Sequence, residues 1–380
     1  MLSPTPPLIS LFLPSLRPGG AEHVMVTLAN EFAKRGYRAE LVVATSSGAL
    51  RHRVSEQVRV VDLRASRALA ALWPLSRHIR RARPAVLLST LNYANVVALA
   101  AAALSTRAVR VVVREAETRT AAAQFEKTKE LRVVLLPWVM RLAYRKAWAV
   151  IAVSEGVAAD LHDTARLTRR DIKVVPNPVV GPELFRSAQE PAPHPWFYDG
   201  GPPVVVAAGR LHPVKDFASL IRAVAEVSER KPVRLIVLGE GDERQNLEAL
   251  RDALDLRDHV DLPGHIADPI PFIANADVFV LSSISEGLPN ALIQAVACGR
   301  SIVATDCRSG PREILDDGQL GRLVPIRNPA ALAEAIGLAI VAEPDRRAMA
   351  LQAERYSVAA STTAYLAAMG LSPEYSAADH

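Results

Sequence analysis

Residues 277–306 read DVFVLSSISEGLPNALIQAVACGRSIVATD and contain one complete unit of the predicted fold. An apolar run, DVFVLSS, is followed by a loop, by a helical stretch that ends at the glycine of NALIQAVACG, and by a second apolar run, SIVATD. Short continuous apolar runs separated by a helix are typical of buried parallel strands joined by a crossover helix. This stretch therefore predicts a βαβ unit.

The same alternation extends along most of the chain. A first series of predicted strands is ISLFLP, AELVVAT, AVLLST, RVVVRE and AVIAVS, and a second adds PVVVAAG, RLIVLGEG and HVDLPG to the two runs above. Strands that alternate with helices predict doubly wound parallel sheets. At roughly 100–200 residues per domain, the 380 residues predict two such domains.

We therefore predict an α/β protein with two Rossmann-like domains, residues 1–178 and residues 179–354. The proline-rich, aperiodic stretch between residues 174 and 203 is interpreted as the linker into the second domain. A C-terminal helix near residues 355–372 is predicted, and two placements are open: it caps the second domain or it packs back on the first.

The composition argues against several classes of protein. Two cysteines, Cys298 and Cys307, are too few for a disulfide framework and have no zinc-site spacing, so we expect a reducing, cytoplasmic environment. We expect no signal peptide and no membrane-spanning helix, because the first residues lack a basic leader and no run reaches roughly 20 apolar residues. No G-x-G-x-x-G follows a predicted strand, which argues against a dinucleotide-dependent oxidoreductase.

Charge is distributed unevenly between the two halves. Up to Lys173 there are 27 Lys and Arg against 13 Asp and Glu, a net charge of +14, and after it 18 against 27, a net charge of −9. A basic half favours contact with an anionic membrane or with nucleic acid, and the alternative is an arginine-rich solvated surface. Nucleic-acid binding would rest on charge alone, and we expect no such partner.

Two cations lie in one loop after a predicted strand of the second domain. In GRLHPVKDF, Gly209 is followed by Arg210 and Lys215 before the next helix begins. A guanidinium fork and an ammonium point charge suit a pyrophosphate group. The alternative is two solvated surface cations.

The loop SEGLPN of the opening stretch has the chemistry of a sugar-phosphate site. Backbone N–H groups of Gly287, Leu288 and Asn290 lie at a predicted helix start, where an anion is stabilised, and Pro289 is tolerated there. Glu286 can accept hydrogen bonds from sugar hydroxyls, and Gln294 can bond a ribose hydroxyl. The alternative is a capped surface helix with incidental polar residues.

A glycine pair opens the first helix of the first domain. Gly19 and Gly20 in RPGGAEH allow the backbone to approach a phosphate or a sugar. Many strand-to-helix turns contain glycine, so this pattern alone has little specificity. His23 follows the pair and is expected to lie on the helix.

In combination these stretches resemble the retaining glycosyltransferases of family 4, which have the GT-B fold of two domains facing across a cleft. The matching text is GGAEHVMVTLANEFAKRGY, VIAVSEGVAADL, VVPNPV, GRLHPVKDF, LGEGDE, SEGLPNALIQAVACGRSIVATD and GPREIL. Within the family it looks most like enzymes that extend lipid-linked or polymeric bacterial glycans. The resemblance implies transfer of a hexose or N-acetylhexosamine from a nucleotide diphosphate sugar, with UDP preferred, to a glycan or polyprenyl-linked acceptor.

The resemblance also implies roles for matching positions. Arg210 and Lys215 would bind the donor diphosphate, and Glu286 would contact the donor sugar. The other positions expected to line the donor site are Gly19, Gly20, Gly209, Gly239, Glu240, His265, Ile266, Gly287, Leu288, Pro289, Asn290 and Gln294.

The chain departs from the family pattern at two places. Gln294 stands where the family usually has a second glutamate, so we expect weaker ribose binding with retained function. Arg114 and Glu115 occupy the place where many relatives have a histidine near the donor sugar. Glu115 is therefore a candidate catalytic residue that orients or deprotonates the acceptor hydroxyl, and the alternative is a salt bridge with Arg114 or Arg119.

No cofactor is expected. No Asp-x-Asp follows a predicted strand, so there is no evident place for a catalytic metal. The leaving diphosphate would be neutralised by Arg210, Lys215 and helix N-termini. The resemblance implies attack on the same face of the sugar, with the departing phosphate accepting the proton.

Residues 131–148, LRVVLLPWVMRLAYRKAW, mix aliphatic side chains, two tryptophans and four cations. This composition suits an interfacial helix, and it also suits a helix that covers a sheet. The predicted strand AVIAVS follows directly, which favours the sheet-covering interpretation. With the basic first half, it leads us to expect peripheral contact with the inner leaflet of the cytoplasmic membrane. Two rival functions remain open: a non-catalytic nucleotide-sugar-binding protein, suggested by Gln294 and the missing histidine, and a nucleotide-sugar epimerase.

Overall fold

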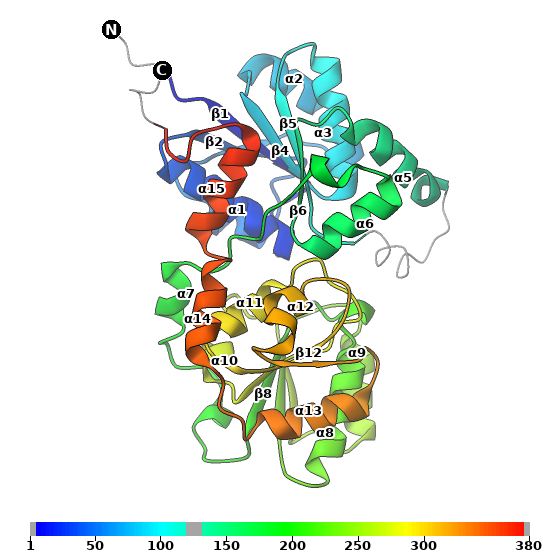
Figure 1. The fold of residues 1–380 in the computed structure, drawn as a ribbon, viewed down its shortest axis with the longest axis vertical. Helices are drawn as coiled ribbons and strands as arrows, with labels where there is room; N and C mark the ends of the chain where they lie inside the picture. Colours follow the sequence, from blue (N-terminus) through cyan, green and yellow to red (C-terminus); the bar gives the residue numbers. More distant parts are fainter. Residues whose placement is uncertain (1–4, 119–130, 376–380) are drawn as a thin grey trace. The chain divides into compact units, whose positions relative to one another are not determined.

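The computed structural model describes residues 5–118 and 131–375, and the chain divides into two compact units. Unit 1 comprises Met1–Pro178 together with Val358–His380, and unit 2 comprises Val179–Ser357. Each unit has its own parallel sheet, as Figure 1 shows. The predicted fold class, an α/β protein with two Rossmann-like domains, is confirmed.

Unit 1 is built on a seven-stranded sheet with the order β3-β2-β1-β4-β5-β6-β7, in which every neighbouring pair is parallel. The strands are β1 (Leu8–Leu13), β2 (Arg38–Val43), β3 (Arg59–Asp62), β4 (Val86–Thr90), β5 (Arg110–Glu115), β6 (Ala149–Ala152) and β7 (Ile172–Val174). The α-helices are α1 (Gly20–Lys34), α2 (Leu72–Ala82), α3 (Asn92–Ser105), α5 (Leu131–Tyr144), α6 (Glu155–Ala165) and α15 (Val358–Met369).

The core of unit 1 follows from the alternation of side chains along a strand. Ile9, Leu11 and Leu13 of β1 point to one face of the sheet, where they join Met25, Leu28 and Phe32 of α1 in one buried cluster. These helical residues recur at intervals of three and four, as one face of a helix requires. The apolar residues that predict β1 and α1 in the sequence are therefore the residues buried in the core of unit 1.

Helix α15 joins unit 1 from the C-terminal end of the chain and lies beside α1 (Figure 1). Leu366 and Met369 are part of the unit 1 core. Two arginines bind its ends: Arg35 Nη2 donates to the carbonyl of Ala359 at 2.8 Å, and Arg110 Nη1 donates to the carbonyl of Gly370 at 2.9 Å. Apolar burial and polar end contacts therefore both attach this helix to the first sheet.

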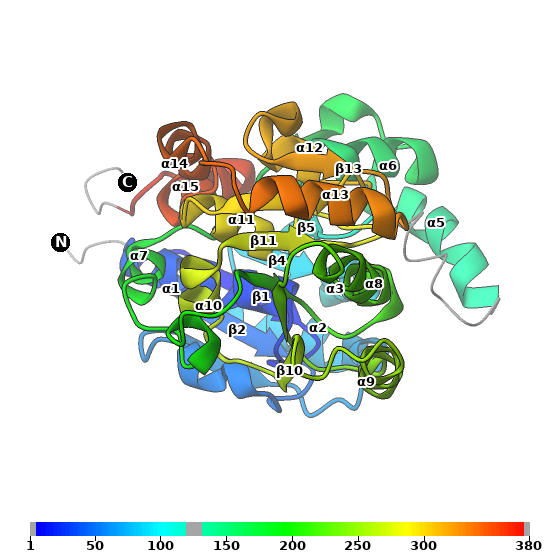
Figure 2. The same ribbon diagram turned by 90° about the horizontal axis from the view of Figure 1, so that it is seen from below.

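Unit 2 is built on a six-stranded parallel sheet with the order β10-β9-β8-β11-β12-β13. The strands are β8 (Val204–Ala208), β9 (Arg234–Leu238), β10 (Val260–Gly264), β11 (Val278–Leu281), β12 (Ser301–Thr305) and β13 (Arg322–Val324). The α-helices are α7 (Pro182–Ser187), α8 (Phe217–Ser228), α9 (Arg244–Ala253), α10 (Ile270–Asn275), α11 (Asn290–Ala297), α12 (Pro311–Ile314), α13 (Pro329–Ala339) and α14 (Arg346–Glu354). Figure 2 shows α8 and α13 side by side, and both contribute to one buried cluster with the strands.

The stretch interpreted as a linker is folded onto unit 2 beyond Pro178. Ala192 is buried, and His194 Nε2 lies 3.0 Å from a carboxylate oxygen of Asp261. Asn275 Nδ2 donates a 3.4 Å hydrogen bond to the carbonyl of Glu190. Proline-rich sequence without periodicity is therefore packed irregular structure at these residues.

Both sheets have a topological switch point. In unit 1 the chain runs from β1 through β2 to the edge strand β3, then returns to β4 and runs through β5 and β6 to the other edge strand, β7. In unit 2 it runs from β8 through β9 to β10, then returns to β11 and runs through β12 to β13. The switch lies between β1 and β4 in unit 1 and between β8 and β11 in unit 2. Ligands of open α/β sheets bind outside the carboxyl ends of the strands at such points.

Candidate active site

An ion pair spans the switch point of unit 2. Lys215 lies in the loop after β8 and Glu286 in the loop after β11, and Lys215 Nζ is 2.5 Å from Oε1 of Glu286. The side chains are 21% and 11% exposed, so the pair is largely shielded from water yet reachable. The structure thus brings together two residues that the sequence separates by 71 positions.

Two further hydrogen bonds join the two loops, and a third, within the loop after β11, orients Glu286. The backbone N–H of Ile284 donates to the carbonyl of Val214 at 2.8 Å. The hydroxyl of Ser282 donates to the carbonyl of Lys215 at 2.7 Å, and that of Ser283 donates to Oε1 of Glu286 at 2.6 Å. Neither serine is given a role in the sequence analysis, since two serines after an apolar run form no recognisable motif before their partners are known.

The Glu286 loop is also held by the loop that follows β12. The N–H of Glu286 donates to the carbonyl of Arg308 at 2.8 Å, and the N–H of Ser309 donates to the carbonyl of Glu286 at 2.9 Å. Gly310 has φ +99°, and a Cβ there would lie 2.7 Å from Cδ of Pro289. Close approach of these loops therefore requires glycine at position 310.

The thiol of Cys307 is buried in this same region. Its burial raises its pKa to about 12, and it lies near enough to Glu286 and Lys215 to interact with their charges. A thiol with such a pKa stays protonated at neutral pH and is a poor nucleophile. Cys307 therefore acts as a small buried side chain beneath the ion pair.

The loops that follow β8, β9 and β10 are joined by backbone hydrogen bonds. Gly209 N–H donates to Leu238 O at 2.9 Å, Leu211 N–H to Glu240 O at 2.8 Å, and Gly239 N–H to Gly264 O at 2.9 Å. A side chain at Gly239, which has φ +150°, would overlap the carbonyl oxygen of Gly209. The predicted positions 209, 210, 239 and 240 thus lie on two loops in direct contact.

The charged side chains of these loops differ in their partners. Arg210 is exposed and has no ion pair within residues 5–118 and 131–375. Glu240 pairs with Arg244 at 2.6 Å, and hydrogen bonding to Arg244 holds the pKa of Glu240 below its usual value. His265 is exposed, Ile266 is half-buried, and His265 lies close enough to Glu240 for a charge interaction.

Helix α11 begins where the Glu286 loop ends. Gly287, Leu288 and Pro289 are buried, and Asn290 is the first helical residue. Gln294 lies one turn along, is half-buried, and has no side-chain hydrogen bond to any residue that the structure describes. An amide without an internal partner is free to bond a ligand.

In unit 1, Gly19 and Gly20 lie at the switch point between β1 and β4. Gly19 is the N-cap of α1 in extended conformation, and a Cβ there would overlap the carboxylate of Glu22. His23 lies on α1 as predicted, with Nδ1 3.1 Å from the carbonyl of Gly19.

Glu115 and Arg114 both lie at the end of β5 and are buried. Glu115 accepts a 2.8 Å hydrogen bond from Asn95 Nδ2 and another from the hydroxyl of Tyr144. Arg114 donates to Thr90, Asn177 and Tyr365. Arg119, the other proposed partner of Glu115, lies outside the described residues.

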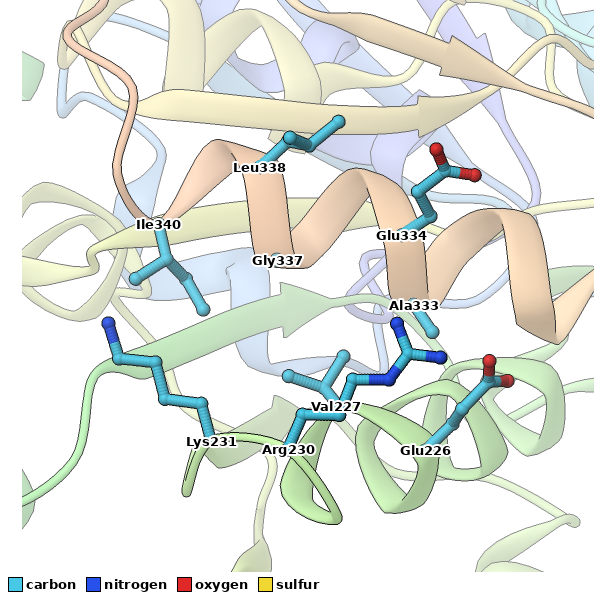
Figure 3. A pocket seen from close by; sticks show the side chains of 9 residues that line it. All are labelled: Glu226, Val227, Arg230, Lys231, Ala333, Glu334, Gly337, Leu338 and Ile340. Carbon is cyan, nitrogen blue, oxygen red and sulfur yellow. The ribbon is translucent and has the colours of Figure 1, made fainter.

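Figure 3 shows a pocket of about 290 Å³ between the C-terminal ends of α8 and α13. Its lining is partly apolar, with Val227, Leu338 and Ile340, and partly charged, with Glu226, Arg230, Lys231 and Glu334. Because α8 leads from β8 back to the start of β9, this pocket lies at the amino end of the strands. It includes none of the predicted donor-binding residues.

The described part of the chain has neither a cluster of metal-ligating side chains nor a membrane-spanning helix. No group of three or more His, Cys, Asp and Glu residues there is arranged to hold a metal ion. No helix among residues 5–118 and 131–375 combines the length and the apolar character needed to cross a bilayer.

Comparison with known proteins relates both units to one kind of enzyme. Residues 18–180 match the model described as Glycosyltransferase Family 4, and residues 202–340 match the model described as Glycosyl transferases group 1. The structure is similar to that of Anabaena HepE in complex with UDP-glucose, with a TM-score of 0.77 and 20% identity over 96% of this chain and 99% of that one. At this identity the similarity concerns the fold.

Two curated relatives are similar in sequence. The first is the N-acetylgalactosamine-N,N'-diacetylbacillosaminyl-diphospho-undecaprenol 4-alpha-N-acetylgalactosaminyltransferase of Campylobacter jejuni, 28% identical over 67% of this chain and 66% of the relative. The second is the lipopolysaccharide core biosynthesis glycosyltransferase LpsE of Rhizobium meliloti, 35% identical over 45% of this chain and 51% of the relative. The chain thus spans between half and two thirds of the length of these relatives.

Proposed function

Because this chain belongs to the glycosyltransferases with the GT-B fold, we propose that it moves a hexose or N-acetylhexosamine from a nucleotide diphosphate sugar, with UDP as the nucleotide, to a glycan or polyprenyl-linked acceptor during synthesis of a bacterial surface polysaccharide. The observation that supports this most is the Lys215–Glu286 pair at the switch point of unit 2. A cation for phosphate and a carboxylate for sugar hydroxyls stand there side by side. The Campylobacter relative, whose name specifies an acetylated amino sugar and a diphospho-undecaprenol acceptor, supports the substrate class.

Within this proposal the main predicted residues have defined roles. Lys215 and the unpaired Arg210 bind the diphosphate, and Glu286 accepts hydrogen bonds from hydroxyls of the transferred sugar. The N-terminus of α11 faces the sugar and phosphates, and Gln294 bonds the ribose. The loops bearing Glu240 and His265 contact the base. In unit 1, Gly19 and Gly20 leave the backbone at the start of α1 open to a phosphate or a sugar.

We propose that transfer proceeds with retention and without a metal. Negative charge that develops on the departing diphosphate is neutralised by Arg210, Lys215 and backbone N–H groups, an electrostatic contribution of the oxyanion-hole kind. The departing phosphate takes the proton of the acceptor hydroxyl. The hydrogen bonds of buried Glu115 to Asn95 and Tyr144 favour an orienting role for this carboxylate over proton transfer.

We further propose that unit 1 rests on the anionic, cytoplasmic face of the membrane. Trp138 and Leu142 on α5 are 61% and 65% exposed, and Trp73 on α2 is 67% exposed. The guanidinium of Arg141 lies over the ring of Trp138 at 5.8 Å. Exposed aromatic rings beside cations are characteristic of interfacial helices.

Vesicle flotation tests the membrane proposal. The protein is expected to float with phosphatidylglycerol vesicles at low salt and to be released as salt is raised. A Trp138→Ala/Leu142→Ala variant should bind less, and absence of binding by the wild type at low salt contradicts the proposal.

Nucleotide release tests the main proposal. Purified protein is incubated with UDP-glucose, UDP-N-acetylglucosamine, UDP-N-acetylgalactosamine and GDP-mannose, and released nucleotide is measured. The favoured outcome is release of UDP from at least one donor. Binding of a donor without any release, even with glycan acceptors, would support the second candidate, a non-catalytic nucleotide-sugar-binding protein, which Gln294 in place of a glutamate favours.

A further inference from the structure

Two consecutive serines follow β11, and each contacts one partner of the ion pair. Ser282 and Ser283 are both 1% exposed. Because successive side chains of an extended chain point to opposite faces, the two hydroxyls can serve different partners. Ser282 donates to the carbonyl of Lys215 at 2.7 Å, whereas Ser283 donates to Oε1 of Glu286 at 2.6 Å.

Ser283 is itself fixed from two sides. Thr305, fully buried at the end of β12, donates its hydroxyl to the carbonyl of Ser283 at 2.5 Å, and the same hydroxyl oxygen lies 3.3 Å from the carbonyl of Leu281. The N–H of the following residue, Ile284, is bonded to Val214. The backbone of Ser283 is therefore held in place before any ligand binds, which keeps its hydroxyl within reach of Glu286.

The two oxygens of the Glu286 carboxylate differ in their surroundings. Oε1 accepts from both Lys215 Nζ and the Ser283 hydroxyl. Oε2 has no hydrogen-bond partner in the part of the chain that the structure describes. One oxygen is thus held by the protein, and the other is available to a ligand.

If the chain has the proposed function, a bound donor would change the contacts of the Glu286 carboxylate. Its diphosphate attracts the ammonium of Lys215, which then shares or leaves its contact with Glu286. The Ser283 hydroxyl is the contact that remains on Oε1, because it cannot move with Lys215. Loss of this contact would free the carboxylate to rotate while the diphosphate stays bound.

We infer that Ser283 is a positioning residue, which holds Oε1 of Glu286 so that Oε2 faces the hydroxyls of the transferred sugar throughout the reaction. Loss of a hydrogen bond to a charged group is expected to lower the rate roughly 10- to 100-fold, which corresponds to about 1.4–2.7 kcal/mol. Because UDP lacks the transferred sugar that Glu286 would bind, the affinity for UDP should not depend on Ser283.

The test compares Ser283→Ala, Ser283→Thr and wild type on the UDP-sugar that wild type hydrolyses fastest among UDP-glucose, UDP-N-acetylglucosamine and UDP-N-acetylgalactosamine. Ser283→Ala is expected to lower kcat roughly 10- to 100-fold, with donor KM and the Kd of UDP changed less than about threefold. Ser283→Thr keeps the hydroxyl and should restore kcat to within about threefold of wild type.

The matched control is Ser301→Ala. Ser301 is a buried serine at the start of β12, at the amino ends of the strands and thus away from the candidate site. Its hydroxyl donates to the carbonyl of Ala342 at 3.2 Å. It should leave kcat unchanged. Wild-type kcat in Ser283→Ala, an equal loss of UDP affinity, or a kcat in Ser283→Thr as low as in Ser283→Ala overturns the inference.

Lys215→Ala and Glu286→Ala in the same assay separate this inference from the function on which it rests. If both are inactive while Ser283→Ala equals wild type, only the positioning role fails. If both turn over like wild type, or wild type releases no UDP from any donor, the proposed function fails and this inference fails with it.

Discussion

Arg114 and Tyr365 are 251 positions apart in the chain, and Nε of Arg114 donates a 2.9 Å hydrogen bond to the Tyr365 hydroxyl. Both side chains are fully buried, and burial raises the pKa of Tyr365. Arg114 also donates to Asn177 at 2.6 Å, the residue before Pro178, where the first segment of unit 1 ends. One guanidinium of β5 therefore binds both α15 and the end of the first segment of unit 1.

Tyr365→Phe removes an acceptor from this buried guanidinium while keeping the ring. We expect a loss of about 1.5–3 kcal/mol in stability, because a charged donor is left without a partner. Thermal unfolding should show a lower Tm for Tyr365→Phe, and an unchanged Tm would mean that water replaces the hydroxyl. Tyr198→Phe, which alters an exposed tyrosine, is the matched control.

Lys215→Ala, Glu286→Ala and Arg210→Ala should each reduce kcat/KM for the donor by at least about 100-fold, since each removes a charge aimed at the reacting groups. Circular dichroism should show that the variants stay folded. Arg230→Ala is the control, with expected wild-type activity, because Arg230 is exposed and lines the pocket at the amino ends of the strands. Wild-type turnover by any of the three would refute the role given to that residue.

Gln294→Glu restores the carboxylate that the family usually has at this position. Because a carboxylate is a stronger acceptor for a ribose hydroxyl than an amide oxygen, UDP affinity should stay equal or rise. Isothermal titration of both proteins with UDP measures this. A large loss of affinity would show that Gln294 has another task.

Gly310→Ala should disturb the Glu286 loop. The new Cβ would lie 2.7 Å from Cδ of Pro289, and φ at this position is +99°. Strain of this kind costs about 1–3 kcal/mol, so both Tm and donor turnover should fall. In Gly337→Ala the added Cβ has no atom within 4 Å, and in a helix it should leave Tm equal or raise it.

Glu40 gives a pH-dependent contribution to the stability of unit 1. Burial raises its pKa, but hydrogen bonds from His78 at 2.6 Å and Ser10 at 2.6 Å outweigh burial and leave the pKa below its usual value. The stabilisation is therefore present above the unfolded-state pKa of about 4.3 and is lost as pH falls through the lowered value.

Melting curves of wild type and Glu40→Gln between neutral pH and about pH 3 test this linkage. The difference in Tm between the two proteins should be largest near neutrality and should shrink below about pH 4.3. Glu56→Gln changes an exposed carboxylate and should show no such trend. A Tm difference that is constant with pH would contradict the assignment.

The central strands could be predicted from sequence because each is a continuous apolar run. LISLFL and VLLST of unit 1, and VVVAA and VFVL of unit 2, are almost entirely buried as β1, β4, β8 and β11. Three strands were not predicted, namely β3, β7 and β13, with the sequences RVVD, IKV and RLV. They are short strands at sheet edges, where one side has no neighbouring strand and polar residues are tolerated.

For the candidate site, the sequence by itself determined the positions near strand ends, because the change from an apolar run to Gly209-Arg210 or to Ser282-Ser283 marks where each strand stops. Only the tertiary structure decided that Lys215 reaches Glu286, that Ser283 binds its Oε1, and that Arg114 is buried beneath α15. The physical reason is the distance along the chain between the residues that interact. A strand or a helix follows from neighbouring residues, whereas a contact between loops depends on the order in which the strands pair.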